Sequence, residues 1–187
     1  MEVARLRRRC TRVTGALLLL GLSVASSATI ASARPPQDPK PPTILFMCPH
    51  GAAKSVLASA YFQRAARERG LNVRVISAGT DPDALVAPVV AKHLKANGYE
   101  VPIAQPRRAT ADDMAQADVV ISIGCDLKDL PAPRGAVQNW DDVPAPSEDF
   151  AAADAKIKER VLQLIDELLL SPASTPRGGR GGHDARA

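Results

Sequence analysis

Short apolar runs alternate with longer amphipathic segments through the middle of the chain. Residues 43–47 and, after an initial Asp, 118–123 are continuously apolar or nearly so, which is typical of strands buried on both faces of a sheet. Residues 54–69 and 150–170 carry apolar side chains at three- and four-residue spacing, which predicts amphipathic helices. Weaker patterns predict a strand over 73–77, a helix over 84–97 and a strand over 136–139, with an irregular stretch between the second helix and residue 118.

Strands that alternate with helices predict an α/β fold. Right-handed crossovers between such strands give a parallel sheet with helices on both faces, so residues 43–170 are expected to form a single three-layer domain. Ligands of such sheets bind at the carboxyl ends of the strands. The loop at 48–54 follows the first strand, which places its chemistry at such an end.

The two ends of the chain differ in composition from this middle part. Residues 1–33 combine five Arg with an uncharged run that closes in Ala31-Ser32-Ala33, which is the pattern of a cleavable signal peptide. A retained membrane anchor is the alternative, because the run is just long enough to span a bilayer. Residues 34–42 contain five prolines and predict an extended linker, and 171–187 have the composition of a disordered tail. We therefore expect an exported protein, periplasmic or extracellular, with no stable membrane insertion after signal cleavage.

The excess of positive charge lies in these ends. The net charge of +4 divides into +4 for residues 1–33, +2 for 171–187 and −2 for 34–170, where 16 basic side chains meet 18 acidic ones. Aromatic residues make up 3% of the chain. A domain of this charge with few aromatic rings lacks the basic surface and the stacking platforms that nucleic-acid binding needs. We therefore expect no nucleic-acid partner.

The residues after the first strand have the composition of an anion-binding loop. Small side chains would let backbone amides converge beside the positive end of the following helix, an arrangement that binds tetrahedral oxyanions. The same field favours the nucleophilic thiolate form of Cys48, and Ser55 offers the sulfur a hydroxyl donor. His50 adds a donor when it is protonated. A buried cysteine before an ordinary turn is the alternative. The candidate oxyanion-binding residues are Pro49, His50, Gly51, Ala52, Ala53 and Lys54.

The stretch Ile44-Leu45-Phe46-Met47-Cys48, followed by five residues and Lys54-Ser55, resembles the phosphate-binding loop of a known family. This family comprises the low-molecular-weight phosphotyrosine phosphatases and the related thiol-dependent arsenate reductases. The resemblance continues in Ser77-Ala78-Gly79-Thr80, in the strand that leads to Gly124-Cys125, and in Trp140 before an acidic, proline-rich turn. It implies a flavodoxin-like, four-stranded parallel sheet, Cys48 as the nucleophile, and a phosphate- or arsenate-like oxyanion as the ligand.

Two departures from the family pattern bear on the chemistry. The family has Arg where this chain has Lys54, so charge neutralisation is kept but the planar, bidentate clamp is lost. The family takes its general acid from an Asp-Pro pair after the Trp region, and Ala145 stands at that position here. Asp142, beside Asp141, is the candidate substitute, and turn formation is its alternative role.

Three activities are compatible with these residues. Arsenate-reductase-like chemistry is the one we favour: it needs a second thiol, for which Cys125 is the candidate after removal of Cys10 with the signal, and an external thiol reductant. Hydrolysis of phosphomonoesters by a low-molecular-weight phosphatase mechanism is the second. A non-catalytic module that binds phosphate-like anions is the third. No Cys/His spacing fits zinc, so we expect neither a metal nor a cofactor.

Overall fold

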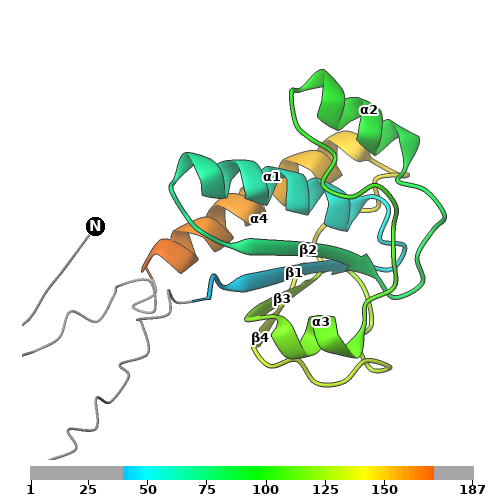
Figure 1. Ribbon diagram of the computed structural model, residues 1–187. Coiled ribbons are helices and arrows are strands. Elements are labelled where there is room, and N and C mark those ends of the chain that lie inside the picture. Colours follow the sequence, from blue (N-terminus) through cyan, green and yellow to red (C-terminus); the bar gives the residue numbers. More distant parts are fainter. Residues whose placement is uncertain (1–39, 171–187) are drawn as a thin grey trace, which may run out of the picture. The chain divides into compact units, whose positions relative to one another are not determined.

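The computed structural model describes residues 40–170, which form a layered α/β domain (Figure 1). The signal peptide expected at 1–33, residues 34–39 of the proline-rich linker and the tail at 171–187 lie outside the described residues. No helix within 40–170 is long and apolar enough to cross a membrane.

Four parallel strands form the central sheet in the order β2-β1-β3-β4. They are β1 (Thr43–Cys48), β2 (Arg74–Gly79), β3 (Val119–Ser122) and β4 (Ala136–Asn139). In this register Cys48 pairs with Gly79 of β2, and Met47 pairs with Ser122 of β3. The carboxyl ends of these three neighbouring strands therefore meet at one edge of the sheet. The predicted four-stranded parallel sheet is confirmed.

Helices cover both faces of the sheet (Figure 1). Helices α1 (Lys54–Glu68) and α4 (Phe150–Leu170) pack together on one face, and α3 (Ala111–Gln116) lies on the other. Because side chains alternate along a strand, Phe46 and Cys48 belong to the core beneath α1 and α4, whereas Met47 belongs to the core beneath α3. The Phe46 ring packs 5.5 Å from that of Phe62 on α1. The sulfur of Cys48 is thereby directed to the α1 side of the sheet.

Two expectations for the helices need correction. Helix α2 (Pro88–Ala96) is shorter than the predicted 84–97, because Pro88 takes the first helical position and keeps Ala87 in extended backbone. The stretch expected to be irregular contains α3, which is too short to show a clear apolar period. A capping box starts it: Thr110 Oγ accepts from the Asp113 amide, and the Asp113 carboxylate accepts from the Thr110 amide.

Candidate active site

The loop between β1 and α1 is held by its carbonyl groups. The carbonyl oxygen of His50 accepts from the amide of Asp83 at 3.0 Å, and that of Ala52 accepts from the amide of Ala87 at 3.0 Å. Within residues 40–170, no backbone amide from His50 to Lys54 donates to a backbone carbonyl. The loop thus anchors its acceptors on segment 81–87, and its own amides, beside the start of α1, have no backbone acceptor among the described residues. Such a set of amides is suited to an oxyanion.

Two glycines bring this loop against the end of β2. Gly51 has a φ of +59°, a left-handed conformation that side chains with a Cβ adopt only with strain. A Cβ on Gly79 would lie 2.7 Å from the Gly51 nitrogen and 2.9 Å from the Pro49 oxygen. Glycine is therefore favoured at position 79 of the Ser-Ala-Gly-Thr segment, because the loop backbone packs directly against its Cα.

Cys48 lies at the base of this loop. Its side chain is 2% exposed, and Sγ lies 3.2 Å from Oγ of the fully buried Ser55 in the first turn of α1. When the sulfur is a thiolate, the Ser55 hydroxyl can donate a hydrogen bond to it. Although Cys48 is buried, it is among the residues that line a cavity.

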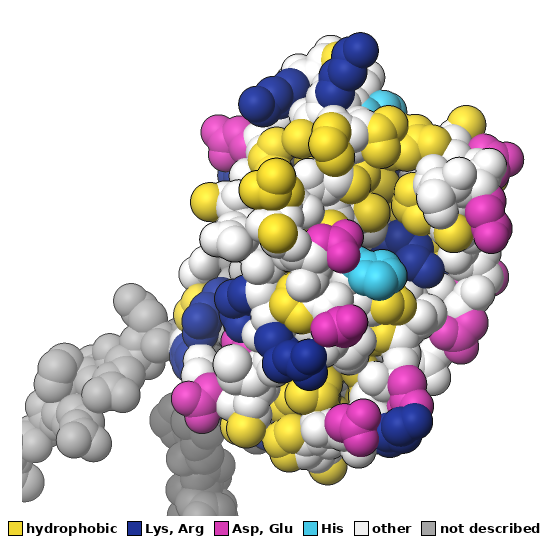
Figure 2. Space-filling view, turned by 90° about the vertical axis from the view of Figure 1, so that its right-hand side faces the viewer, with side chains coloured by type: hydrophobic (Ala, Val, Ile, Leu, Met, Phe, Trp, Pro, Cys, Tyr) yellow, Lys and Arg dark blue, Asp and Glu magenta, His cyan; other side chains and the backbone are white. Residues whose placement is uncertain are grey.

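The cavity above Cys48 has a volume of about 380 Å³. Helix α2 and the turn before α4 complete its wall, and none of the lining residues is Phe, Tyr or Trp. Figure 2 views the molecule from the side of the strands' carboxyl ends, where a histidine lies beside acidic and apolar side chains. The lining consists of Cys48, Pro49, His50, Ala52, Ala53, Lys54, Asp83, Ala87, Val89, Ala145, Pro146 and Ser147.

Most of the residues singled out in the sequence come together here. All of the candidate anion-binding residues except Gly51 line the cavity, and Ser55 lies beside the sulfur of Cys48. Ala145 lines it too, at the position where the family pattern has an acid. Asp142 is not part of the lining: its carboxylate pairs with Arg160 at 2.7 Å and Lys156 at 3.6 Å, and the Arg160 guanidinium lowers its pKa. The structure therefore does not bring Asp142 to Cys48.

The residues on the other wall of the cavity were not predicted from the sequence. Asp83, Ala87 and Val89 reach it because segment 81–87 runs along the anion loop before α2 begins. The early Pro88 was the available signal, since it excludes the helical start that the pattern had suggested at 84. Among residues 40–170, no three His, Cys, Asp or Glu side chains gather in a way that could hold a metal ion.

Cys125 lies just beyond β3, outside the cavity lining. It is half-buried, and its Sγ lies 3.3 Å from Ser122 Oγ, which also donates to the Cys125 carbonyl at 2.8 Å. Burial raises the pKa of the Cys125 thiol, the Ser122 hydroxyl opposes that rise, and the charges of Cys48 and Lys54 raise and lower it respectively. The ammonium of Lys54 would lie 3.0 Å from a Cβ on Gly124. The charges of Cys48 and Lys54 thus both act on the Cys125 thiol.

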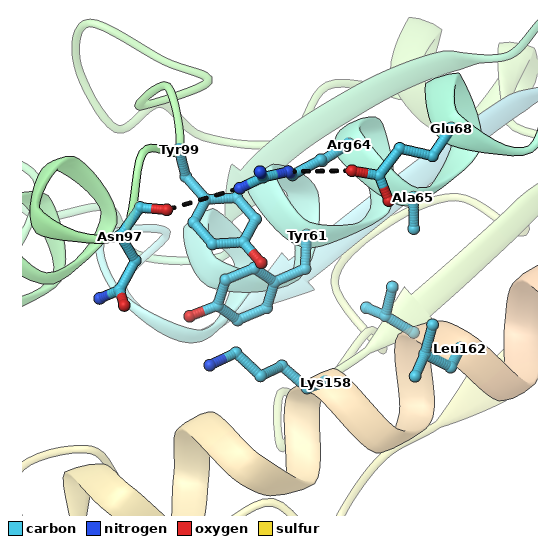
Figure 3. Close-up of a pocket in the computed structure, with 9 residues that line it drawn as sticks. Tyr61, Arg64, Ala65, Glu68, Asn97, Tyr99, Lys158 and Leu162 are labelled. Carbon is cyan, nitrogen blue, oxygen red and sulfur yellow. Dashed lines mark hydrogen bonds and ion pairs between the residues drawn. The ribbon is translucent and has the colours of Figure 1, made fainter.

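A second cavity, of about 440 Å³, lies between α1, α4 and the end of α2 (Figure 3). Tyr61 and Tyr99 meet edge to face in it, with ring centroids 4.8 Å apart. The Tyr61 hydroxyl donates to Asp154, and burial together with that carboxylate raises the Tyr61 pKa far above its usual range. Arg64 is bonded to Glu68, and Lys158 to Asp154. The charged side chains around this second cavity are thus paired with one another. Because its lining also contains no cysteine, we place the chemistry at Cys48.

The sequence model described as "Low molecular weight phosphotyrosine protein phosphatase" matches residues 43–169. The chain belongs to this family. The resemblance in the sequence was based on the loop after β1 and its cysteine, among other segments, and the sheet that it implied is the one the structure has.

Within the family, named arsenate reductases are among the relatives. A protein of Halobacterium salinarum named "Putative arsenate reductase" is 28% identical over 127 residues, which cover 65% of this chain and 89% of that protein. The Corynebacterium glutamicum thioredoxin-dependent arsenate reductase is also 28% identical, with a TM-score of 0.58; the match covers 70% of this chain but only 63% of that one. The Vibrio cholerae low-molecular-weight phosphotyrosine phosphatase has a TM-score of 0.61 at 21% identity, with 68% and 97% covered, and shows the shared fold.

Proposed function

We propose that this protein reduces arsenate, with Cys48 as the nucleophile and Cys125 as the second thiol. The observation that carries the proposal is Cys125, placed where two neighbouring parallel strands end and acted on by the charges of Cys48 and Lys54. A cavity without aromatic walls suits a small inorganic oxyanion better than a phosphotyrosyl ring. The 28% identity to proteins named as arsenate reductases points the same way.

In the first step, arsenate lies on the loop amides with Lys54 neutralising part of its charge. The thiolate of Cys48 attacks arsenic, an S–As bond forms, and one As–O bond breaks. The departing oxygen takes up a proton and leaves as water. The Ser55 hydroxyl lies beside the attacking sulfur and can donate a hydrogen bond to it.

In the second step, the thiolate of Cys125 attacks Sγ of Cys48. The S–S bond forms, and the electron pair of the S–As bond passes to arsenic, which leaves as arsenite in the +3 state. Two electrons have moved from the two sulfurs to arsenic, so the products are one arsenite and one Cys48–Cys125 disulfide. An external thiol or dithiol reductant then restores both thiols.

A single-turnover experiment tests the proposal. The reduced chain is mixed with arsenate in the absence of other thiols, and arsenite and free thiols are counted. We expect one arsenite and two lost thiols per chain, no arsenite from Cys48→Ser, and no disulfide from Cys125→Ser. Cys10→Ser is the matched control and should behave as the unsubstituted chain does. Retention of both thiols with arsenate present would contradict reduction.

Phosphomonoester hydrolysis is the second candidate. The observation in its favour is the cavity, which at about 380 Å³ exceeds the size of a bare oxyanion and has an apolar wall that includes Ala87, Val89 and Pro146. Turnover of an aryl phosphate that needs Cys48 but not Cys125 would favour it over reduction. Binding of phosphate with neither activity would instead indicate an anion-binding module.

We also propose export, on the sequence of residues 1–33 alone. Expression of the full chain should give a mature protein that starts at Arg34 and is found outside the cytoplasm. Retention of the whole chain in the membrane fraction would favour the alternative of an N-terminal anchor. In an oxidising compartment the proposed reductant would have to act there as well.

A further inference from the structure

The cavity above Cys48 lacks the carboxylate that the family pattern supplies. Ala145 occupies the corresponding wall, and Asp142 is bound to Arg160 and Lys156 instead. The departing oxygen still needs a proton, because neither hydroxide nor an alkoxide is a good leaving group at neutral pH. Among the lining residues, the ionisable side chains are Cys48, His50, Lys54 and Asp83.

His50 and Asp83 form a pair on the wall of this cavity. Nδ1 of His50 lies 3.3 Å from Oδ1 of Asp83, and the carbonyl of His50 accepts from the Asp83 amide at 3.0 Å. One backbone and one side-chain contact thus join the same two residues. With Nδ1 facing the carboxylate, Nε2 is the ring nitrogen left for another partner. Both side chains are more than half exposed, at 65% and 55%, so the imidazole can exchange protons with water.

We propose that His50, oriented by Asp83, is the proton donor of this site. The inference rests on the proposed function, because it concerns the departure of oxygen from the oxyanion that Cys48 attacks. The role is distinct from adding one more donor to the anion loop. It assigns to the His50–Asp83 pair the task that a carboxylic acid would perform at position 145.

The step balances with the imidazolium as the acid. As the S–As bond forms, the breaking As–O bond leaves its electron pair on oxygen, which takes the proton from Nε2 and departs as water. His50 becomes neutral and regains a proton from solvent before the next turnover. The Asp83 carboxylate faces Nδ1 of the ring, and its negative charge offsets the positive charge that a protonated His50 adds beside Lys54.

The test compares His50→Gln and Asp83→Asn with the unsubstituted full chain. Single-turnover arsenite formation is measured across pH, and phosphate affinity is measured by calorimetry. We expect His50→Gln to lower the rate by roughly 10²- to 10⁴-fold, the usual contribution of a general acid, with a change in phosphate affinity below about tenfold. The fall in rate at high pH, where the imidazolium is lost, should disappear in this variant. Asp83→Asn should cause a smaller loss and keep that fall.

Asp81→Asn is the matched control, because the Asp81 side chain is 87% exposed and its partner is Arg108. It removes the same charge two residues away and should leave rate and pH profile unchanged. If the wild-type chain turns over and His50→Gln is equally fast, the role of His50 is overturned, whereas the proposed function stands. A loss of phosphate affinity as large as the loss in rate would also overturn it, since His50 would then only bind the anion. A wild-type chain that turns over neither arsenate nor an aryl phosphate would overturn the proposed function, and this inference with it.

Discussion

Gly79→Ala separates the shape of the anion loop from the stability of the fold. The φ of Gly79 is outside the left-handed region, so alanine is compatible with its own backbone. The added methyl would nevertheless lie 2.7 Å from the nitrogen of Gly51, 2.9 Å from the oxygen of Pro49 and 3.0 Å from the Cα of Gly51. All three are backbone atoms of the loop, which cannot rotate away as the end of a side chain would.

The size of the effect follows from these distances. Non-bonded carbon atoms rest about 3.5–4.0 Å apart, so the loop has to move by roughly 0.5–1 Å. Overpacking of this kind costs about 1–3 kcal/mol of stability. A misplacement of about 1 Å at a reacting group costs on the order of 10²-fold in rate. We therefore expect Gly79→Ala to fold, to lose a modest part of its unfolding free energy, and to lose about 100-fold in arsenate or aryl phosphate turnover.

Gly70→Ala is the control for stability without loop displacement. Gly70 has a φ of +69°, and a Cβ there would meet no atom within 4 Å. Its left-handed backbone should cost about 1–2 kcal/mol, a loss similar to that of Gly79→Ala, with turnover unchanged. Urea unfolding and steady-state kinetics on both variants check the pair of expectations. If Gly79→Ala retained the wild-type kcat/KM, the loop would not depend on its contact with β2, and the reasoning would be refuted.

Three further predictions concern single charged or hydroxyl side chains. Lys54→Met should weaken phosphate binding by about 10- to 100-fold, the worth of a charge-assisted hydrogen bond; an unchanged calorimetric affinity would show that the ammonium does not reach the anion. The Arg107 guanidinium lowers the pKa of Asp113 to about 2, so its stabilisation is complete above the unfolded pKa and is lost as pH falls toward 2. Asp113→Asn should therefore lower the free energy of unfolding in urea by about 2 kcal/mol at pH 7. The difference in unfolding free energy between variant and wild type should narrow from pH 5 downward, and a difference that stays constant would refute this. Ser122→Ala should slow alkylation of Cys125 about 2- to 10-fold in a Cys48→Ser background, and an equal rate would exclude Ser122 as a partner of that thiolate.

The amino-acid pattern alone determined the elements with long or strongly apolar periods. The bounds of α4 at 150–170 and of β4 at 136–139 agree with the sequence expectation, and β1, β3 and α1 differ by one or two residues at their ends. Asp149 caps α4, since its carboxylate accepts from the amide of Ala152. The loop after β1 was equally local, because a cysteine, small residues and a helix start follow one another in the chain. Helix α3 was not predicted, because six residues give too little periodicity.

Tertiary structure decided what stands opposite that loop. Asp83 reaches the cavity because segment 81–87 pairs with the loop carbonyls before Pro88 starts α2, and no periodic pattern encodes such a pairing. Asp142 is close to Ala145 in the chain, yet the packing of α4 gives it Arg160 and leaves Ala145 at the cavity wall. Backbone periodicity is a property of neighbours in sequence, so it fixes elements and local turns. Which side chains face one cavity depends on contacts between distant segments, and those are set only when the layers pack.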